Sequence, residues 1–548
     1  MARWDTPECP GEDRHPPLNL AALGAVYSAP LASLGDDRPP GPSTFATPWR
    51  CRTRENLTGA SLPRIRRDLA RAWRLMLALR TSEAQKAIDQ VELQLDDIST
   101  SAAKPLRGAT QLLRAVGFAL RDDSLAALAI ASPHLNPAAQ GSYITSTLCR
   151  LGYWHLGKFD AFHALPRHQP RLRWSRSHAI SAMVDLSIEA AVALDHLNIT
   201  TAKRLASDAL TMAEQAGVAA GLAALPACLT AQVLYEEGCL DDAGALLRNH
   251  LPAINAEGSI ECALRAYLVL ARIARQRMHY DLAAILLHDA EALGERRGWP
   301  RLVVASMAER VSLLLEAGRP REARLSAENL DRYAETHRGG SGRSDVEIAQ
   351  YRTLARWRVA WVETPSREAV AALRQLYHRA VERRDLYAAC RLAVELAEML
   401  ASIGEDKEAD ALFFQTITSG AATGLYQVFL EQGRRSAGLL RRAYDRADAA
   451  DSPDREVLPF VGSLLSRWEA NHATGAAIRP ASAISDTLTV RERDILGRIG
   501  QGLPNKRIAR ILAISPETVK SHIKNIFLKL GVGTRAEAVF RGKSLGLV

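Results

Sequence analysis

Four polar residues in the stretch 516–530, near the carboxyl terminus, have side chains that suit hydrogen bonding to DNA. A rotation of 100° per residue places Ser521, Lys524 and Asn525 on one face of a helix, and Lys520 lies at the edge of that face. Base edges in the major groove offer acceptors to lysine, and they offer both donors and acceptors to asparagine and serine. This face therefore predicts direct contact with base pairs.

The opposite face of the same stretch is apolar, so the helix must pack against other elements. Ser515 supplies an N-cap, and Pro516 suits the first helical position because its missing N–H costs nothing there. Gly531 then ends the helix. The residues predicted to face the core are Val519, Ile523, Ile526, Phe527 and Leu530.

Three further short helices are expected around this one. Thr489 and Glu492 form a capping box that begins a first helix, and a second helix is expected over 505–512. Thr534 and Glu537 form another capping box, which begins a fourth helix. The side chains expected to point inward from the first two helices are Ile495, Leu496, Ile499, Ile508, Ile511 and Leu512.

The distribution of charge supports contact with DNA. Residues 488–548 contain twelve Lys and Arg against four Asp and Glu, a balance of +8, whereas the whole chain carries +9. The other residues are therefore nearly neutral as a group. Clustered cations that neutralise phosphates supply most of the non-specific affinity for DNA, and here they coincide with the predicted reading helix.

The carboxy-terminal sixty residues resemble the DNA-binding domain of the LuxR family of bacterial transcription regulators. The family pattern of L-T-x-R-E, G-x-x-N-K-x-I-A, S-x-x-T-V-K-x-H, K-L-G-V and R-x-E-A-V is matched almost throughout. Two positions depart from it. Pro504 stands where a Ser or Thr N-cap is usual, and Leu528 places an apolar side chain on the exposed side of the third helix.

The resemblance implies roles for individual residues. The third helix enters the major groove, and Lys520, Ser521 and Lys524 face the bases, together with Asn525 from the same polar face. The fourth helix pairs two DNA-binding domains near a two-fold axis, at Ala538 and Val539. The residues expected to lie toward the sugar-phosphate backbone are Asn505, Lys506, Thr518, His522 and Lys529.

Ordinary surface roles remain open for some of these residues. Lys520 and Lys524 could be a solvated pair, which is the usual state of charged helix positions. His522 is equally compatible with a phosphate contact and with a surface residue that has no partner on DNA. Glu492 is explained by its capping box and needs no functional role.

The longest part of the chain predicts a helical-repeat superhelix over residues 62–472. A turn that ends in a small alanine recurs at intervals of 35 to 46 residues. Low aromatic content and the absence of alternating Val, Ile and Thr favour helices over strands. Such a period is typical of stacked helix-turn-helix repeats in which the alanine sits where paired helices touch. The alanines are Ala84, Ala126, Ala161, Ala202, Ala243, Ala283, Ala323, Ala369 and Ala409.

This region is similar to the tetratricopeptide-like sensor part of large LuxR-type regulators of the MalT kind, especially over 221–334. An unrelated α-solenoid would give the same spacing. A repeat stack offers a concave surface for an unknown small-molecule inducer or protein partner. Aromatic residues that either line such a pocket or wedge the core are Trp154, Tyr235, Tyr267, Tyr280, Trp357 and Trp361.

Two segments are expected to lack regular structure. Nine of the 25 prolines fall within the first 48 residues, so 1–61 is expected to be a disordered tail. Residues 473–486 are rich in Ala, Ser and Pro and are expected to link the repeats to the DNA-binding domain, 487–548. The predicted fold class is all-α, with a tetratricopeptide-like superhelix followed by a four-helix LuxR-type helix-turn-helix domain.

Several other functions are disfavoured. The nearest approach to a phosphate-binding loop, residues 152–158, continues with Phe159 in place of the hydroxyl that would hold Mg²⁺. Seven cysteines without C-x-x-C spacing argue against a disulfide framework or a zinc site, and no histidine cluster has ligand spacing. We therefore expect no ATPase module, no cofactor, no metal and no enzyme activity.

The sequence as a whole predicts a transcription regulator of the cytoplasm, because no apolar run reaches membrane-spanning length and no signal peptide opens the chain. Its partners would be double-stranded DNA, as a homodimer, and the signal bound by the repeats, with RNA polymerase as a further candidate. Two alternatives stay open. One is a protein-interaction scaffold, and the other is an ATP-dependent regulator with a cryptic nucleotide site.

Overall fold

A computed structural model gives the structure of the chain and describes 61–77, 80–96, 98, 103–135, 143–165, 176–218, 220–337, 342–431, 436–449, 453–476, 490–501 and parts of 503–538. The predicted tail, 1–61, lies outside these residues except for Ser61, and so does the predicted linker beyond Ala476. The chain divides into two compact units, Met1–Val461 and Gly462–Val548, each of which is considered by itself.

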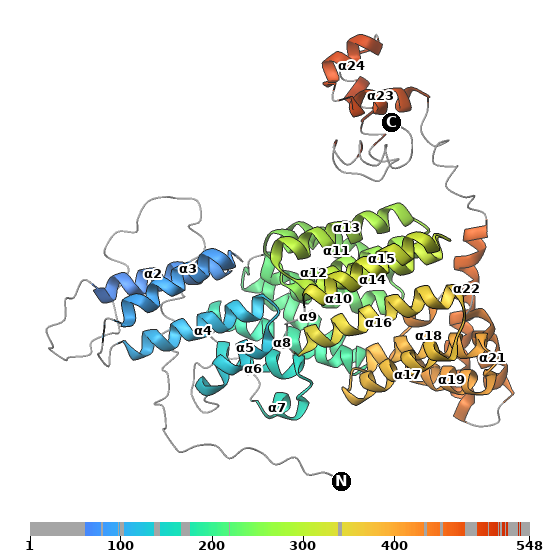
Figure 1. Cartoon of the computed structure of the whole chain (residues 1–548), viewed down its shortest axis with the longest axis horizontal. Helices are drawn as coiled ribbons and strands as arrows, with labels where there is room; N and C mark the ends of the chain where they lie inside the picture. The colour runs from blue at the N-terminus through green and yellow to red at the C-terminus, as the bar shows by residue number, and fades with distance from the viewer. Residues whose placement is uncertain are drawn as a thin grey trace. The chain divides into compact units, whose positions relative to one another are not determined.

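The first unit is built from helices, and the described residues of the chain contain no strand (Figure 1). The prediction of an all-α fold is confirmed. The helices are α2 (Ser61–Leu77), α3 (Thr81–Asp96), α4 (Lys104–Leu120), α5 (Ser124–Ala131), η2 (Ser132–His134), α6 (Tyr143–His155), α7 (Phe159–Ala164), α8 (Arg176–Asp195), α9 (Ile199–Gln215), α10 (Ala220–Glu236), α11 (Leu240–Glu257), α12 (Ile260–Gln276), α13 (Tyr280–Arg297), α14 (Pro300–Glu316), α15 (Pro320–Thr336), α16 (Arg343–Glu363), α17 (Arg367–Glu382), α18 (Leu386–Ser402), α19 (Asp406–Thr423), α20 (Gln427–Leu430), α21 (Ser436–Asp448), η4 (Pro453–Val457) and α22 (Leu458–Ala476).

These helices form hairpins whose turns lie where the repeated alanines predict them. The described turns join α2 to α3, α4 to α5, α6 to α7 and so on up to α18 and α19, and the predicted alanine begins the second helix of each pair. The first helix of one pair also packs on the first helix of the next, as α10, α12, α14 and α16 do in succession. The repeat prediction is therefore confirmed as a stack of helical hairpins.

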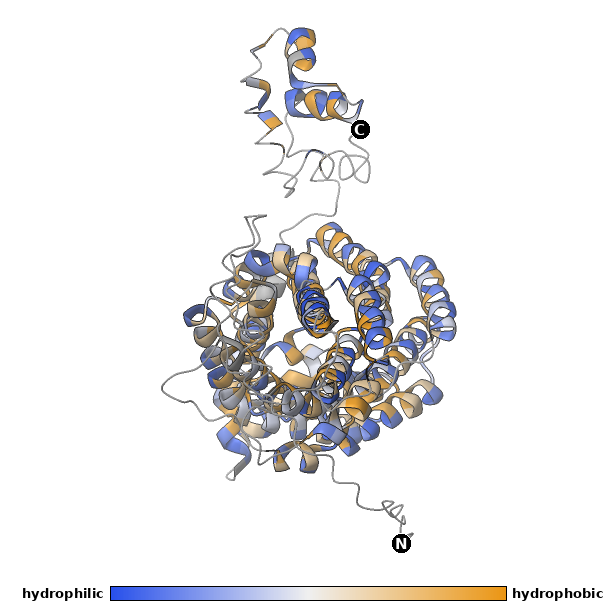
Figure 2. Cartoon of the chain, turned by 90° about the vertical axis from the view of Figure 1, so that its left-hand side faces the viewer, coloured by the Kyte–Doolittle hydropathy of each residue, from blue (hydrophilic) through white to orange (hydrophobic). Residues whose placement is uncertain are grey.

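Most of the repeated alanines are buried because the two helices of a hairpin cross there. Ala243, Ala323 and Ala409 have no exposed surface. Ala126 and Ala161 are only half-buried, and their neighbours Ala127 and Phe162 fill the corresponding core positions instead. In Figure 2, apolar faces turn toward neighbouring helices and polar faces turn outward, which is the pattern of stacked amphipathic helices.

Several hairpin turns contain a residue in the left-handed region of backbone conformation. Gly238 and Gly318 fill this position with φ of 86° and 71°. Leu197 and Met278 fill the equivalent position with φ of 60°, although each carries a side chain. A side chain in this region costs roughly 1–2 kcal/mol, so the packing of the two hairpins must hold these turns in place.

One helix is longer than its sequence predicts. The second helix of the pair that begins near Leu222 is expected over 240–250, but α11 continues to Glu257 with Pro252 inside it. Proline removes only the hydrogen bond that its own N–H would donate one turn back, and the core contact of Ile254 with the next pair holds the rest of the helix in place.

The superhelix brings helices from distant repeats together. Trp299, which caps α14, donates its indole N–H to the carbonyl oxygen of Leu120 at the end of α4, at 3.0 Å. The amide of Tyr426 donates to the carbonyl oxygen of Glu236 at the end of α10, at 2.8 Å. Because these partners are separated by about 180 residues or more, the repeats contact one another beyond their neighbours in sequence.

The second unit contains α22 from Gly462 onward and two further helices, α23 (Val490–Gly500) and α24 (Asn505–Leu512). The described residues from Thr518 to Ile526 are also helical, as are Arg535 and Ala538. A single apolar core joins α23, α24 and these later residues and contains Ile495, Leu496, Ile499, Ile508, Ala509, Leu512, Val519, Ile526 and Ala538.

Candidate nucleic-acid interface and interior pocket

The start of the predicted third helix, which follows α24, is fixed by Ser515. The Ser515 hydroxyl accepts the backbone N–H of Thr518 at 3.0 Å and lies 2.8 Å from the Thr518 hydroxyl. This is the predicted N-cap, in which a short side chain satisfies a donor that the first helical turn leaves open. Behind it, Val519 and Ile526 are buried, so the apolar back of the helix faces the core as predicted.

The start of α24 is held by Arg535. One guanidinium nitrogen of Arg535 donates to the side-chain oxygen of Asn505 at 2.9 Å, and another donates to the carbonyl oxygen of Leu503. Arg491 on α23 donates to the carbonyl oxygen of Leu512, at the other end of α24, at 2.5 Å. Two arginines thus fix both ends of this helix, and the Asn505 amide N–H groups remain available as donors.

The structure places only some of the residues that are predicted to bind DNA. Thr518 and Lys520 are exposed on the third helix, and His522 is half-buried beside them. Asn505 is half-buried at the first position of α24. The remaining predicted contacts lie outside the described residues, either wholly or in their side chains: Ser521, Lys524, Asn525 and Lys529 wholly, and Lys506 in its side chain.

Two predictions are wrong in this unit. Ile511 is expected to face inward but is 47% exposed, because α24 turns the side of Ala509 to the core instead. Ala538 is expected near a dimer axis but has no exposed surface and belongs to the core of its own domain. A fully buried methyl group cannot contact a second domain. Val539, its predicted companion, lies outside the described residues.

Sequence reasoning missed three arginines of this unit. Arg507 and Arg510 are exposed on α24, where they add two cations to the surface of this unit. Arg535 has a structural role through Asn505. The local excess of positive charge was the available signal for Arg507 and Arg510, whereas nothing in the local pattern pairs Arg535 with a residue thirty positions away.

The interior of the first unit contains a chain of buried ion pairs. Arg301 on α14 donates to Asp122 at 2.9 Å, pairs with Glu347 on α16 at 3.3 Å and also binds Glu261 on α12. Arg343 continues the chain, because it pairs with Glu347 and lies 2.7 Å from Asp195 on α8. The chain of contacts therefore links helices α8, α12, α14 and α16 with the turn after α4.

Burial shifts the pKa values of several groups in this chain. It raises the pKa of Asp122 to about 6, against the attraction of Arg301. It also lowers the pKa of His155 to about 3, so the ring is neutral at physiological pH. Glu261 is also buried, but Arg301 and Arg265 hold its pKa well below the usual value.

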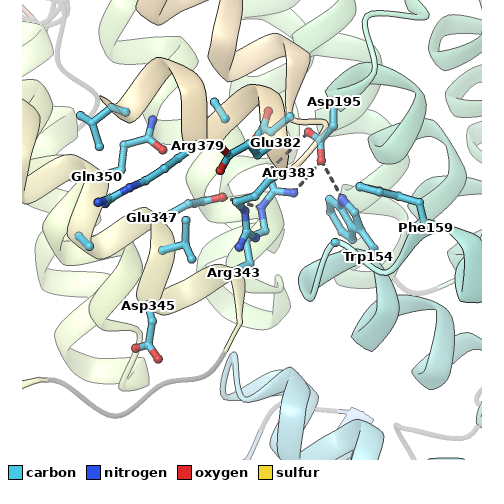
Figure 3. Close-up of a pocket in the computed structure, with 16 residues that line it drawn as sticks. Trp154, Phe159, Asp195, Arg343, Asp345, Glu347, Gln350, Arg379, Glu382 and Arg383 are labelled. Atoms are coloured by element: carbon cyan, nitrogen blue, oxygen red, sulfur yellow. Dashed lines mark hydrogen bonds and ion pairs between the residues drawn. The ribbon is translucent and has the colours of Figure 1, made fainter. Parts of the chain in front are cut away.

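A pocket of about 360 Å³ lies beside this chain of charges (Figure 3). Helices α6 and α7 line one side with Trp154 and Phe159, and α8 contributes Asp195. Helices α16 and α17 line the other side, and Asp385 comes from the turn before α18. Of the six aromatic residues considered in the sequence, Trp154 is the one that lines this pocket.

Trp154 is tightly positioned at the pocket. Its indole N–H donates to Asp195 at 2.7 Å, and the Arg343 guanidinium lies 4.9 Å from the centre of its ring (Figure 3). Gly152, in the segment that approaches a phosphate-binding loop, lies within α6. A β-carbon there would be 2.8 Å from Cβ of Leu128, so close packing explains this glycine.

Neither a metal cluster nor a membrane span is found in the part of the chain that the structure describes. No three His, Cys, Asp or Glu side chains among those residues converge as metal ligands would. None of the described helices combines the length and the apolar character that crossing a bilayer requires.

Comparison with known proteins shows which family the second unit resembles. Residues 486–541 match the family described as bacterial regulatory proteins, luxR family. The nitrate/nitrite response regulator protein NarL of Escherichia coli K12 is 57% identical over 99 residues, which cover 18% of this chain and 42% of NarL.

A longer but weaker similarity includes the repeats. The HTH-type transcriptional regulator MalT of Vibrio campbellii is 26% identical over 336 residues, which cover 58% of this chain and 35% of that protein. The chain therefore spans about a third of the length of this relative. Among solved structures, a Rap protein complexed with competence and sporulation factor is 13% identical and has a TM-score of 0.49, covering 66% of this chain and 98% of that one.

The family match covers α23, α24 and the described residues of the third helix, whose first turn Ser515 caps. Residues 486–541 therefore match the luxR family of bacterial regulatory proteins over a domain of the helix-turn-helix type.

Proposed function

We propose that this chain is a bacterial transcription regulator that reads operator DNA with its LuxR-family domain and is controlled by its helical repeats. The match of residues 486–541 to the LuxR family carries the proposal. Two relatives of the chain support it as well, because MalT is named as an HTH-type transcriptional regulator and NarL as a response regulator protein. An excess of eight positive charges over residues 488–548 supports attraction to phosphates.

Within this proposal, the third helix enters the major groove. Lys520, Ser521, Lys524 and Asn525 are assigned to base edges. Backbone contacts are assigned to Asn505, Lys506, Thr518, His522 and Lys529, to which we add the exposed Arg507. The position of Asn505 supports its assignment, because Arg535 holds the amide at the first turn of α24.

The regulator is proposed to bind DNA as a homodimer in the cytoplasm, with RNA polymerase as a further partner. Because Ala538 is a core residue, the dimer contact is assigned to Val539 and to other residues on that side of the fourth helix. A two-fold pair of domains would match paired half-sites on the operator.

The repeats are proposed to receive the signal. A small molecule or a protein that binds one arrangement of the repeats better than another would shift the population toward that arrangement. The proposed boundaries are 62–472 for the repeats, 473–486 for the linker and 487–548 for the DNA-binding domain. The compact units divide instead at Val461 and Gly462, inside α22.

Binding of the full chain to DNA fragments, measured by gel shift at several salt concentrations, tests the proposal. We expect binding that weakens steeply with salt, together with discrete sites enriched when genomic fragments compete for the protein. A chain that binds no duplex at low salt would instead be a protein-interaction scaffold. Equilibrium dialysis with labelled ATP tests for a nucleotide-dependent regulator, and we expect no retention.

A further inference from the structure

The pocket beside Trp154 lies between parts of the superhelix that are far apart in sequence. Asp195 and Arg343 form an ion pair across 148 residues, and both line the pocket. A volume of about 360 Å³ is near the lower end of the range for small-molecule sites. A ligand here would contact α6 and α8 on one side and α16 and α17 on the other.

The charges next to this pocket are unbalanced. Five carboxylates line the pocket against three guanidinium groups, those of Arg343, Arg379 and Arg383. His155, whose ring contacts Trp154, does not add a positive charge, because burial lowers its pKa to about 3. The carboxylates are those of Asp195, Asp345, Glu347, Glu382 and Asp385.

Asp385 is half-buried at the start of α18, where the charge of Arg343 acts on it without a direct ion pair. One of its carboxylate oxygens accepts the backbone N–H of Ala388 at 3.1 Å, as the N-cap of α18. Among the described residues it forms no ion pair, whereas Asp195 and Glu347 are both paired with Arg343. Burial, with the nearby charge of Asp195, raises the pKa of Asp385 to about 7.

The other walls of the pocket suit an apolar body. Phe159 is 6% exposed and lies at one side, and Val346, Leu376 and Ala380 line the opposite side. Arg379 and Arg383 line the pocket as well, so a carboxylate on the ligand would also find a partner.

We propose that this pocket binds a small molecule through an ammonium group that pairs with Asp385, while the apolar part of the molecule packs against Phe159 and Leu376. A half-buried carboxylate that forms no direct ion pair gains from a cation, because that cation offsets the excess of negative charge around the pocket. The proposal names the class of molecule that the repeats would bind as their signal. The role of this molecule in regulation rests on the proposed function, whereas its binding to the pocket does not.

The ligand would also contact helices from distant parts of the superhelix. It would contact α7 through Phe159, and it would contact α17 and the start of α18 through Leu376 and Asp385. Binding would therefore favour the arrangement in which these helices meet. A change in the affinity of the whole chain for DNA would follow if the DNA-bound state prefers one arrangement.

Isothermal titration calorimetry of the full chain tests the proposal. The ammonium probes are ethylamine, phenethylamine and phenylalanine, and the matched probes without a cation are 3-phenylpropanol and 3-phenylpropionate. We expect phenethylamine or phenylalanine to bind and the two matched probes not to bind. Tighter binding of phenylalanine than of phenethylamine would add Arg379 or Arg383 to the site. At pH 6 we expect binding to release a proton, because the cation displaces the one on Asp385.

Asp385→Asn is the decisive variant, because asparagine is an equally good N-cap and removes only the charge. We expect it to weaken binding by about 10-fold or more and to abolish the proton release. Glu368→Gln is the control, because it removes the same charge from an exposed residue of α17 that does not line the pocket. We expect that variant to change affinity by less than about 3-fold.

Three results would overturn the proposal: no ammonium probe binds, the anionic probe binds as well as the ammonium probes, or Asp385→Asn binds as tightly as the unaltered chain. A gel shift on the same protein separates this failure from failure of the proposed function. If the chain binds DNA but no ammonium probe, the proposed ligand class is wrong and the proposed function stands. If it binds the ammonium probes but no DNA, the proposed function is wrong and the binding site stands.

Discussion

Arg301 donates to Asp122 at 2.9 Å, and both side chains are almost completely buried although 179 residues separate them. The same guanidinium serves Glu261 and Glu347, so one cation neutralises acids from three other segments. Removing one partner from a buried ionic cluster leaves the other charges buried without a counter-ion. This lowers the free energy of unfolding by more than the ion pairs themselves contribute to it.

Arg301→Met therefore should destabilise the repeat unit strongly. We expect the free energy of unfolding to fall by about 3–5 kcal/mol, as measured by urea denaturation followed by circular dichroism. Arg319→Met is the control, because Arg319 pairs with Glu322 in an exposed i,i+3 ion pair and should lose at most about 1 kcal/mol. Similar losses in both variants would mean that the buried cluster has no special role.

The pH dependence of stability should reveal Asp385. Its pKa is about 7 in the folded chain and close to the usual 3.8 after unfolding, so the folded state holds the proton more tightly. The stabilising contribution of this proton is complete below about pH 4 and is lost as the pH rises through 7. Asp385→Asn should then match the unaltered chain near pH 4 and exceed its stability by about 1–2 kcal/mol at pH 8. Thermal unfolding at several pH values measures this, and a difference that is constant with pH would contradict it.

Lys524→Ala and Lys506→Ala should affect DNA binding in different ways. The first removes an assigned base contact, so discrimination between operator and random duplex should fall by about 1–3 kcal/mol. The second removes an assigned phosphate contact, so affinity for both duplexes should fall together and the salt dependence should flatten by about one unit of slope. Fluorescence anisotropy at four salt concentrations separates these outcomes. Equal losses on operator and random DNA for Lys524→Ala would remove its assignment to a base.

Ser515→Ala should loosen the reading helix at its first turn. The hydroxyl of Ser515 satisfies the Thr518 N–H, and loss of an N-cap costs about 1 kcal/mol. We expect amide hydrogen exchange to accelerate at Thr518 and Val519, with weaker binding to operator DNA. Ser515→Asn keeps a capping oxygen and should restore both properties. If the alanine variant exchanges no faster than the unaltered chain, the cap does not hold the helix.

Local chemistry in the sequence predicts the hairpins and the helix boundaries of the DNA-binding domain. The alanines repeat because paired helices cross at a small side chain, as Ala243 and Ala323 do. Helix α24 begins and ends at the predicted residues because Asn505 and Leu512 bound a short amphipathic stretch. These features depend on residues within a few turns of one another.

Other features depend on contacts that no local pattern records. Ile508 and Leu512 face the core of the DNA-binding domain, but a choice between Ala509 and Ile511 as the third core residue depends on how the neighbouring helices cross. The burial of Ala538 has the same origin. In the repeats, the periodicity of the sequence predicts each hairpin, but it does not predict that Arg301 pairs with Asp122. The sequence therefore predicts neither the buried ion pairs nor the pocket beside them.

The hydrogen bond from Trp299 to the carbonyl of Leu120 also bears on how this chain can be divided. An open solenoid tolerates the loss of terminal repeats, because each module touches only its immediate neighbours and stability adds up from one end to the other. In this chain the first hairpins supply partners for helices in the middle of the stack. Deleting them would remove the Leu120 carbonyl that accepts from Trp299 and the Asp122 carboxylate that pairs with Arg301. Shortened versions of the chain for crystallisation or for binding assays should therefore keep α4 and α5. Without them we expect the whole repeat unit to lose its fold, and not the terminal hairpins alone.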